Sequence, residues 1–385
     1  MTDMCASSPS MDAELTSMEL HHQGLNVPGR PVSSAELYLY DYKDASLPDA
    51  EALQRVSLVG FPGGDDDGAD FHTLGFAYDE QTSTLYVSNH ARAGSRIEVF
   101  ALDLDARTAT HRATLRHPLL HGPNALVLLG PGELLVTNDH RFPARDYRLL
   151  AQVETYLGTP TGTVVHVKLD VAPLPNNKNK NKGSSSTYEI RDARVLAHVP
   201  FANGLELLNR STVAVASTSR AAVYLFTLSG RDDDDDEKKQ QTTSSSSSSS
   251  KNNKDSGKRD KLKMKYKTQI RTPFHPDNLS LTADGRLLIA GHPHTPSLER
   301  FAATRYVCND AAELALASDE TRRYCADGSS STTPSWAAEW TEARGLRSLY
   351  AGVEYPSSAT AAWDVERGVG IVAGLYAKGL LVWRD

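Results

Sequence analysis

Short strand-like runs separated by turns recur along almost the whole chain, and this pattern limits the possible folds more than any other feature. Runs such as Glu36–Tyr40, Arg96–Leu102 and Gly162–Leu169 are rich in β-branched and aromatic residues. Turn signals return about every 8–12 residues, which is typical of a sandwich, barrel or propeller. We expect few helices, with candidates at Thr295–Arg305 and at Asp310–Ser318, where alanine and leucine favour helix.

Two low-complexity segments interrupt the strand pattern. Residues 173–186 are rich in Asn, Lys and Ser, and residues 231–267 hold Asp232–Asp236, a serine run and a lysine-rich run. Neither composition can build a packed core, so we expect disordered surface insertions. Without them about 335 residues remain, which suits about six four-stranded blades of roughly 40–50 residues each. We therefore predict one six-bladed β-propeller domain over residues 31–385, after a weakly structured segment 1–30.

Composition excludes several classes of function. The net charge of -7 argues mildly against a nucleic-acid partner, and no apolar run reaches the roughly 20 residues of a membrane span. Residues 1–17 lack the basic start and apolar stretch of a secretory signal, so the expected location is cytoplasmic by default. Three cysteines argue against a disulfide framework. Cys308 and Cys325 could pair, but we expect free thiols. The oligomeric state is left open.

Three similar turns each place an asparagine before an apolar strand. They lie about 75–80 residues apart and carry Asn124, Asn203 and the pair Asp277 and Asn278. The innermost strands of a propeller converge on a central channel, so these side chains are expected to meet there. Calcium prefers such amide and carboxylate oxygens. A single Asn is more often a turn residue, but the matching set predicts a calcium site with these four residues as ligands.

Histidines near the same turns are candidates for acid–base chemistry, because imidazole titrates near neutral pH. One histidine alone is more often structural, but a group at one end of a channel favours a catalytic role. The group is His72, His90, His121, His140, His275, His292 and His294.

Several motifs resemble those of the serum paraoxonase/arylesterase family. Val136–Phe142 (Val-Thr-Asn-Asp-His-Arg-Phe) is similar to the family's Thr-Asn-Asp-His-Tyr-Phe, and Phe201–Gly204 equals its Phe-Ala-Asn-Gly. Asp277–Asn278 and Gly291–Pro293 resemble its Asp-Asn-Ile-Ser and Cys-His-Pro segments. Tyr86–His90 resembles its Val-Val-Asn-His. The motifs occur in the family's order.

The resemblance implies a fold and an activity. The family is a six-bladed propeller with two calcium ions, and it hydrolyses lactones, aryl esters and in some cases organophosphates. By this resemblance Asn124, Asn203, Asp277 and Asn278 match ligands of the catalytic calcium, and His90 matches the second histidine of a proposed dyad. The implied mechanism is metal-assisted hydrolysis, in which calcium polarises the carbonyl of a small ester or lactone and a base activates water.

The chain also departs from the family's pattern. Leu74 stands where the family has its leading dyad histidine. His72 is the candidate substitute, because residues two apart on a strand share a face. Ala125 removes a carboxylate ligand of the second calcium. The N-terminal carboxylate pair has no firm counterpart, the closing disulfide is absent, and the first blade is expected to be incomplete. The candidates for the carboxylate pair are Asp12, Glu14 and Glu19.

These departures leave two other hypotheses open. One is a catalytically degenerate propeller that binds a partner or serves a structural role. The other is a propeller of different activity, such as a sugar-lactone hydrolase with another metal. Turnover of an aryl ester and a lactone, with and without a calcium chelator, separates them from the first hypothesis.

Overall fold

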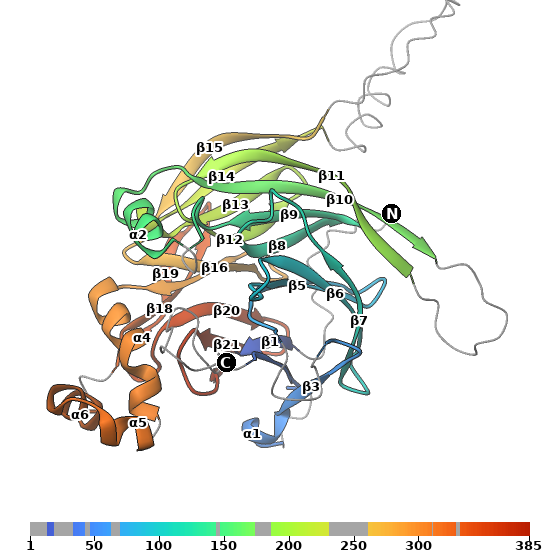
Figure 1. Cartoon of the computed structure of the whole chain (residues 1–385). Coiled ribbons are helices and arrows are strands. Elements are labelled where there is room, and N and C mark those ends of the chain that lie inside the picture. Colours follow the sequence, from blue (N-terminus) through green and yellow to red (C-terminus); the bar gives the residue numbers. More distant parts are fainter. Residues whose placement is uncertain are drawn as a thin grey trace, which may run out of the picture.

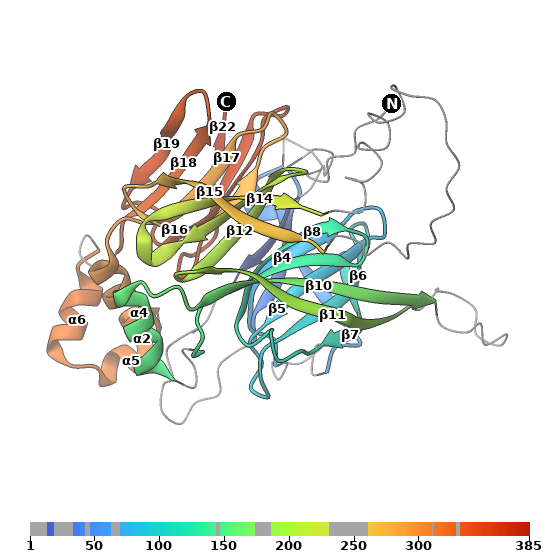
Figure 2. The same cartoon turned by 90° about the horizontal axis from the view of Figure 1, so that it is seen from above.

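The fold is a β-propeller of five sheets arranged around a common axis (Figure 1; Figure 2). The computed structural model describes residues 14–18, 34–42, 47–62, 70–143, 147–173, 186–230, 261–309, 311–328 and 332–385. Within these ranges no helix is long and apolar enough to cross a membrane. The arrangement of the five sheets confirms the predicted propeller class.

Each sheet begins with its innermost strand and continues outward in chain order. The first contains β4 (Thr73–Asp79), β5 (Thr84–Asn89), β6 (Arg96–Asp103) and β7 (Thr108–Leu115). The second contains β8 (Pro123–Gly130), β9 (Glu133–Asn138), β10 (Gly162–Pro173) and β11 (Ser186–Val199). The third contains β12 (Ala202–Asn209), β13 (Thr212–Ser217), β14 (Ala222–Ser229) and β15 (Lys263–Arg271). The fourth contains β16 (His275–Leu281), β17 (Leu287–His292), β18 (Ser335–Thr341) and β19 (Gly345–Gly352), and the fifth contains β20 (Ser358–Asp364), β21 (Val369–Gly374) and β22 (Leu381–Arg384).

The prediction of six blades is wrong, because the N-terminal strands do not form a separate blade. These strands are β1 (Glu14–Met18), β2 (Glu36–Tyr40) and β3 (Leu53–Val59), with the short helix α1 (Asp49–Ala52) before β3. β3 pairs in parallel with the outer strand β7, from Ser57 opposite Thr108 to Val59 opposite Thr110. The three strands therefore extend the first sheet to seven strands. A count from chain length could not anticipate this pairing.

The core lies between neighbouring sheets, and the central strands are buried on both faces. Leu135 packs in the cluster between the second and third sheets, whereas the adjacent Val136 packs with Ile97 in the cluster between the first and second. Side chains that alternate between two buried faces give a continuous apolar run rather than a polar–apolar alternation. The Leu-Leu-Val sequence of β9 has this form.

Every innermost strand carries an irregularity near its start. The register shifts lie between Thr73 and Phe76 in β4, Pro123 and Leu126 in β8, Ala202 and Leu205 in β12, Pro276 and Leu279 in β16, and Ser358 and Thr360 in β20. Such bulges redirect side chains and are frequent beside functional sites. Equivalent positions of neighbouring blades are therefore presented at the same end of the propeller.

Helices occupy the connection between the second and third strands of two blades. α2 (Arg148–Leu157) follows β9, and α4 (Thr295–Asn309), α5 (Ala311–Leu316) and α6 (Asp319–Ala326) follow β17. The 3-10 turn η1 (Thr218–Arg220) fills this connection in the blade between them. The two predicted helices are confirmed in α4 and α5, while the sequence reasoning missed α2 and α6.

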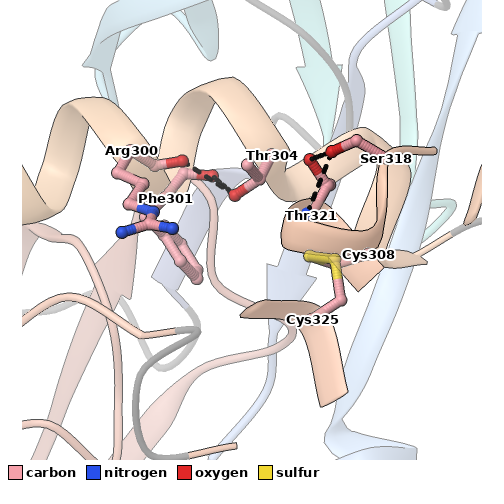
Figure 3. The surroundings of a disulfide bond; sticks show 7 residues. All are labelled: Arg300, Phe301, Thr304, Cys308, Ser318, Thr321 and Cys325. Atoms are coloured by element: carbon pink, nitrogen blue, oxygen red, sulfur yellow. Dashed lines mark hydrogen bonds between the residues drawn. A yellow bond between two sulfur atoms is a disulfide. The ribbon is translucent and has the colours of Figure 1, made fainter. Parts of the chain in front are cut away.

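The prediction of free thiols is wrong for two of the three cysteines. Cys308 on α4 and Cys325 on α6 form a disulfide (Figure 3). α6 itself begins with a side-chain cap, in which the Thr321 amide donates to Ser318 Oγ at 3.2 Å. The separation of the two cysteines in sequence gave no sign that α4 and α6 fold back on one another. Cys5 lies outside the described residues.

The predicted insertions fall mostly outside the described residues. For 231–267, however, the expected C-terminal boundary is wrong. Leu262 is buried in the core, and β15 already begins at Lys263. Because lysines alternate along β15, the start of this strand cannot be distinguished from the lysine-rich run in the sequence. Of the N-terminal candidate ligands, Asp12 and Glu19 lie outside the described residues, and Glu14 is the first residue of β1.

The N-terminal and C-terminal strands meet in a polar cluster. The Arg384 guanidinium donates to Tyr40 Oη at 3.2 Å and to Asp49 Oδ2 at 3.2 Å, and Tyr40 donates to Asp49 Oδ1 at 2.5 Å. Tyr40 also packs against Ile371 of the last blade. This cluster joins parts of the chain that lie 344 residues apart.

Removing the arginine of this cluster should destabilise the fold only slightly. We expect Arg384→Ala to lower the free energy of unfolding by about 0.5–1 kcal/mol, because partly exposed ion pairs are screened by water. Arg191→Ala, which breaks an exposed pair with Asp170 within one hairpin, should have no measurable effect. Urea denaturation of both variants checks this. An equal loss of unfolding free energy in the two variants would contradict a role for Arg384 in joining the N-terminal and C-terminal strands.

Candidate functional site

The inner-strand bulges bring the predicted ligand residues to adjoining positions in three consecutive blades. Asn124 lies in the bulge of β8, Asn203 in that of β12, and Asp277 and Asn278 in that of β16. The Thr137 hydroxyl bridges the first two bulges, because it accepts from the Ala125 amide at 2.9 Å and donates to the Asn203 carbonyl at 2.7 Å.

The bulges of β12 and β16 lie in direct backbone contact. A Cβ added to Gly204 would lie 2.4 Å from the Asp277 carbonyl oxygen and 2.7 Å from Asn278 Cα. Gly75 in β4 approaches β8 in the same way, with an added Cβ 2.3 Å from the Asn124 carbonyl oxygen. Glycine is therefore required at these two positions by the spacing of the blades.

Two of the asparagine amides are fixed by threonine hydroxyls. Asn203 Nδ2 donates to Thr218 Oγ1 at 3.1 Å, and Asn278 Nδ2 donates to Thr360 Oγ1 at 3.0 Å. Asn203 is only 5% exposed, and its Oδ1 has no hydrogen-bond partner among the described residues. A buried amide oxygen without a partner is costly and rare. This oxygen has the chemistry of a ligand for a hard cation.

The carboxylate of the set is held by a histidine. Asp277 Oδ2 lies 3.0 Å from His292 Nε2, and both side chains are buried. Asp277 is the only carboxylate among the four predicted ligands. Across the described part of the chain, no group of three or more His, Cys, Asp or Glu side chains could hold a metal ion. The candidate centre is thus an amide-rich set with one carboxyl side chain.

Three other bulge positions include the departures noted in the sequence. Leu74 and Gly75 occupy the bulge of β4, and Ala125 follows Asn124 in the bulge of β8. None of these three offers a polar side chain. The bulge of the first blade therefore carries no polar side chain where the bulges of the next three blades carry Asn or Asp.

The two candidate bases lie opposite each other across the β4–β5 hairpin. The His90 amide donates to the His72 carbonyl at 2.8 Å, and cross-strand neighbours share a face of the sheet. His90 Nε2 lies 2.8 Å from the Pro123 carbonyl, which can only accept. In neutral His90 the basic lone pair is therefore on Nδ1. His72 is buried, with Nε2 3.4 Å from Asp70 Oδ1.

Comparison with known proteins identifies the relationship. The family model described as Arylesterase matches residues 10–173. The sequence is 32% identical to serum paraoxonase/lactonase 3 of Mus musculus over 135 residues, which cover 34% of this chain and 36% of that protein. It is 34% identical to serum paraoxonase/arylesterase 2 of Gallus gallus over 150 residues, which cover 37% and 39% of the two chains. Over residues 10–173 this chain is similar to the arylesterase family.

The matches to these paraoxonases extend over little more than a third of their length. The residues matched by the arylesterase model contain Asn124, His72 and His90 but not Asn203, Asp277 or Asn278. Among solved structures, a putative 6-phosphogluconolactonase from Bacteroides fragilis has a TM-score of 0.49 at 7% identity, covering 98% of this chain and 92% of that one. A likeness at this level carries no argument about function.

Sequence reasoning missed Asp139, the carboxylate inside the paraoxonase-like Thr-Asn-Asp-His motif. Its Oδ1 accepts from the His140 amide at 2.7 Å and lies 3.4 Å from His140 Nδ1. Burial opposes ionisation, but His140 and the nearby His90 hold the pKa of Asp139 below its ordinary value. In turn, although burial acts in the opposite direction, Asp139 raises the pKa of His140. The sequence shows that the motif contains the Asp139 carboxylate, but it does not show which side chains surround that carboxylate.

His140 is positioned from both sides. Thr155 Oγ1 donates to the Ala151 carbonyl, so it accepts from His140 Nε2 at 2.7 Å. The His140 ring also packs on Phe201, with ring centroids 4.4 Å apart. α2 thus fixes the histidine that lies between the second and third blades of this arylesterase relative.

Glu206, three residues after Asn203 on β12, is a further carboxyl group on this inner strand. Its Oε1 accepts from the Leu207 amide at 2.8 Å, and none of the ion pairs in the described ranges includes it. Burial raises the pKa of Glu206 from 4.5 to about 7. The folded protein therefore favours the neutral form of this side chain.

Glu206 should make stability depend on pH. Because its folded-state pKa is raised, its contribution is fully present below about pH 4.5 and is lost as the pH rises through about 7. We expect Glu206→Gln to gain about 1–3 kcal/mol relative to wild type at pH 8 but not at pH 4.5. Urea denaturation at both pH values, with the exposed Glu189→Gln as control, measures this. A gain independent of pH would contradict it.

Proposed function

We propose that this paraoxonase/arylesterase relative is a calcium-dependent hydrolase of lactones and aryl esters. The observation that carries the proposal is the buried, unpartnered Oδ1 of Asn203, at the junction of inner-strand bulges that also carry Asn124, Asp277 and Asn278. Similarity to that family alone would suggest the class of reaction. The orphaned oxygen supports a ligand-binding role for this chain's own residues.

The residues present fit a calcium ion in their chemistry. Calcium takes oxygen ligands, including amide carbonyls and carboxylates. The hydroxyls of Thr218 and Thr360 bind the nitrogen ends of two of the amides, which leaves the oxygen ends for a ligand. The chemistry that calcium supplies when bound is polarisation of an ester or lactone carbonyl. His292 holds the Asp277 carboxylate ready for this role.

His90 is the proposed general base. Its Nε2–H is held by the Pro123 carbonyl, so Nδ1 takes the proton from the attacking water. The Pro123 carbonyl belongs to the strand that carries Asn124, so one segment positions the base and a ligand residue. His72, on the opposite strand, is the proposed substitute for the missing dyad histidine.

Hydrolysis should depend on both calcium and Asn203. We expect the purified chain to hydrolyse phenyl acetate and a δ-lactone with calcium present and to lose this activity on chelation. Asn203→Ala should lower calcium affinity by at least about tenfold, measured by isothermal titration calorimetry. Asn209→Ala, at the far end of the same strand, is the matched control. Hydrolysis that persisted after chelation and in the Asn203→Ala variant would contradict the calcium mechanism.

A degenerate propeller that acts as a binding or structural protein is the second candidate. The apolar bulge at Leu74 and the Ala125 position favour it, because each lacks a polar group that the family's pattern provides. The same experiment separates the two. Calcium binding that depends on Asn203, without turnover of either substrate, is the result expected for the degenerate protein.

A further inference from the structure

A second polar cluster lies beside the two candidate bases, in the outer strands of the first blade. Glu98 on β6 is fully buried, and its two carboxylate oxygens accept four hydrogen bonds. Oε1 accepts from Asn89 at 3.0 Å and Arg96 at 2.6 Å. Oε2 accepts from His111 at 2.9 Å and Thr114 at 2.5 Å. We call these five residues the Glu98 network.

The network keeps Glu98 ionised inside the blade. Burial alone would raise the pKa of Glu98, but the hydrogen bonds from His111, Thr114 and Asn89, together with the charge of Arg96, hold it below its ordinary value. A buried carboxylate whose acceptor sites are all used has one stable position. Its donors are fixed with it.

Asn89 connects this network to the candidate bases. Its Nδ2 donates both to Glu98 and to the Asp70 carbonyl at 3.0 Å, and its Oδ1 accepts from the His72 amide at 2.8 Å. Asn89 is itself fully buried and directly precedes His90. The His90 amide in turn donates to the His72 carbonyl. One amide side chain therefore holds the backbone at the end of the hairpin that carries both histidines.

A second branch reaches the ring of His72. Arg96 lies between Glu98 and Asp70, with its Nη2 4.0 Å from Asp70 Oδ2. Asp70 also accepts from the Arg92 amide at 2.9 and 3.0 Å. Asp70 Oδ1 also lies 3.4 Å from His72 Nε2. Backbone and ring of His72 thus both depend on groups that Glu98 positions.

We propose that Glu98 is a positioning residue for His72 and His90, acting through Asn89 and Arg96. Its effect on catalysis rests on the proposed function, whereas its effect on the hairpin end does not. A purely structural role in the blade would distribute the effect of its loss over β5, β6 and β7. A positioning role concentrates the effect at residues 72 and 90.

Amide hydrogen exchange in Glu98→Gln tests the positioning without any assay of activity. The variant keeps the size of the side chain but removes its charge. It also replaces one carboxylate oxygen, which accepts two hydrogen bonds, by an NH2 group that can only donate. We expect exchange at the His72 and His90 amides to be about tenfold faster or more, with the central amides of β5 unchanged. Glu133→Gln is the matched control, since Glu133 pairs with the buried His166 in the next blade and has no link to the hairpin. Exchange that was unchanged at residues 72 and 90, or faster throughout the sheet, would overturn the proposal.

Kinetics give the second readout. We expect Glu98→Gln to reduce kcat on phenyl acetate by about tenfold with KM changed less than about twofold, and Glu133→Gln to leave both unchanged. If wild type shows no turnover, the proposed function fails while the exchange experiment still decides the positioning. If Glu98→Gln does not fold, Asn89→Ala breaks the same link directly, and unchanged exchange at His72 in that variant would equally overturn the proposal.

Discussion

His90→Gln should reduce kcat for phenyl acetate by about 10²–10⁴-fold, because a positioned general base contributes about that much to proton transfer. The Pro123 carbonyl fixes His90 Nε2 as the donor, so Nδ1 is the basic nitrogen. Glutamine retains a donor for the carbonyl and removes the base. Calcium affinity, measured by calorimetry, should not change, since His90 is not among the proposed ligands.

His72→Gln separates the two histidines. If His72 replaces the missing dyad histidine, its loss should lower kcat by at least about tenfold. If His72 only completes the contact with Asp70, kcat should stay within about twofold of wild type. A His90→Gln variant with wild-type kcat would remove His90 from the mechanism, whatever the result for His72.

Gly204→Ala should both destabilise the propeller and weaken calcium binding. The added methyl group would lie 2.4 Å from the Asp277 carbonyl oxygen and 2.8 Å from the Leu279 amide nitrogen. These are backbone atoms of the neighbouring blade and cannot turn aside as a side chain can. We expect a loss of about 1–3 kcal/mol in the free energy of unfolding. Movement of Asp277 and Asn278 away from Asn203 should lower calcium affinity by at least about tenfold.

Gly130→Ala is the matched control for this prediction. Gly130 ends the inner strand β8, and an added Cβ there has nothing within 4 Å. Its effect on stability should stay within about 0.5 kcal/mol. Urea denaturation and calcium titration of both variants give the comparison. A Gly204→Ala variant as stable as Gly130→Ala would show that the blades can separate at no cost, contrary to the close approach described above.

The sequence predicted the propeller class and the repeated turns, because both depend on local patterns. Apolar strands and Asn-bearing turns are contiguous, and each of the turns carrying Asn124, Asn203 and Asp277 begins an inner strand. Features that depend on distant pairing escaped prediction. The parallel contact of β3 with β7 reduced the blade count, and the return of α6 onto α4 joined Cys308 to Cys325.

The surroundings of the candidate site were the least predictable. The distance of His72 from Leu74 along the strand predicts it as the substitute base, but its place opposite His90 follows from the hairpin register. Asp139 could be read within a motif, but its effect on the pKa of His140 depends on the folded structure. Glu98, at the start of an ordinary-looking strand, gave no signal at all in the sequence.

The contact of Arg384 with Tyr40 and Asp49 has a consequence for how the chain folds. It joins residues separated by almost the entire sequence, and contacts of such long separation slow folding because the intervening chain must first be ordered. During synthesis the first four blades can assemble as their strands emerge, whereas the junction at Tyr40 must wait for the last strand. Until then the apolar surface around Tyr40 and Ala52, which packs against Ile371 in the folded protein, is exposed. A chaperone that shields this surface would be expected to raise the yield of folded protein.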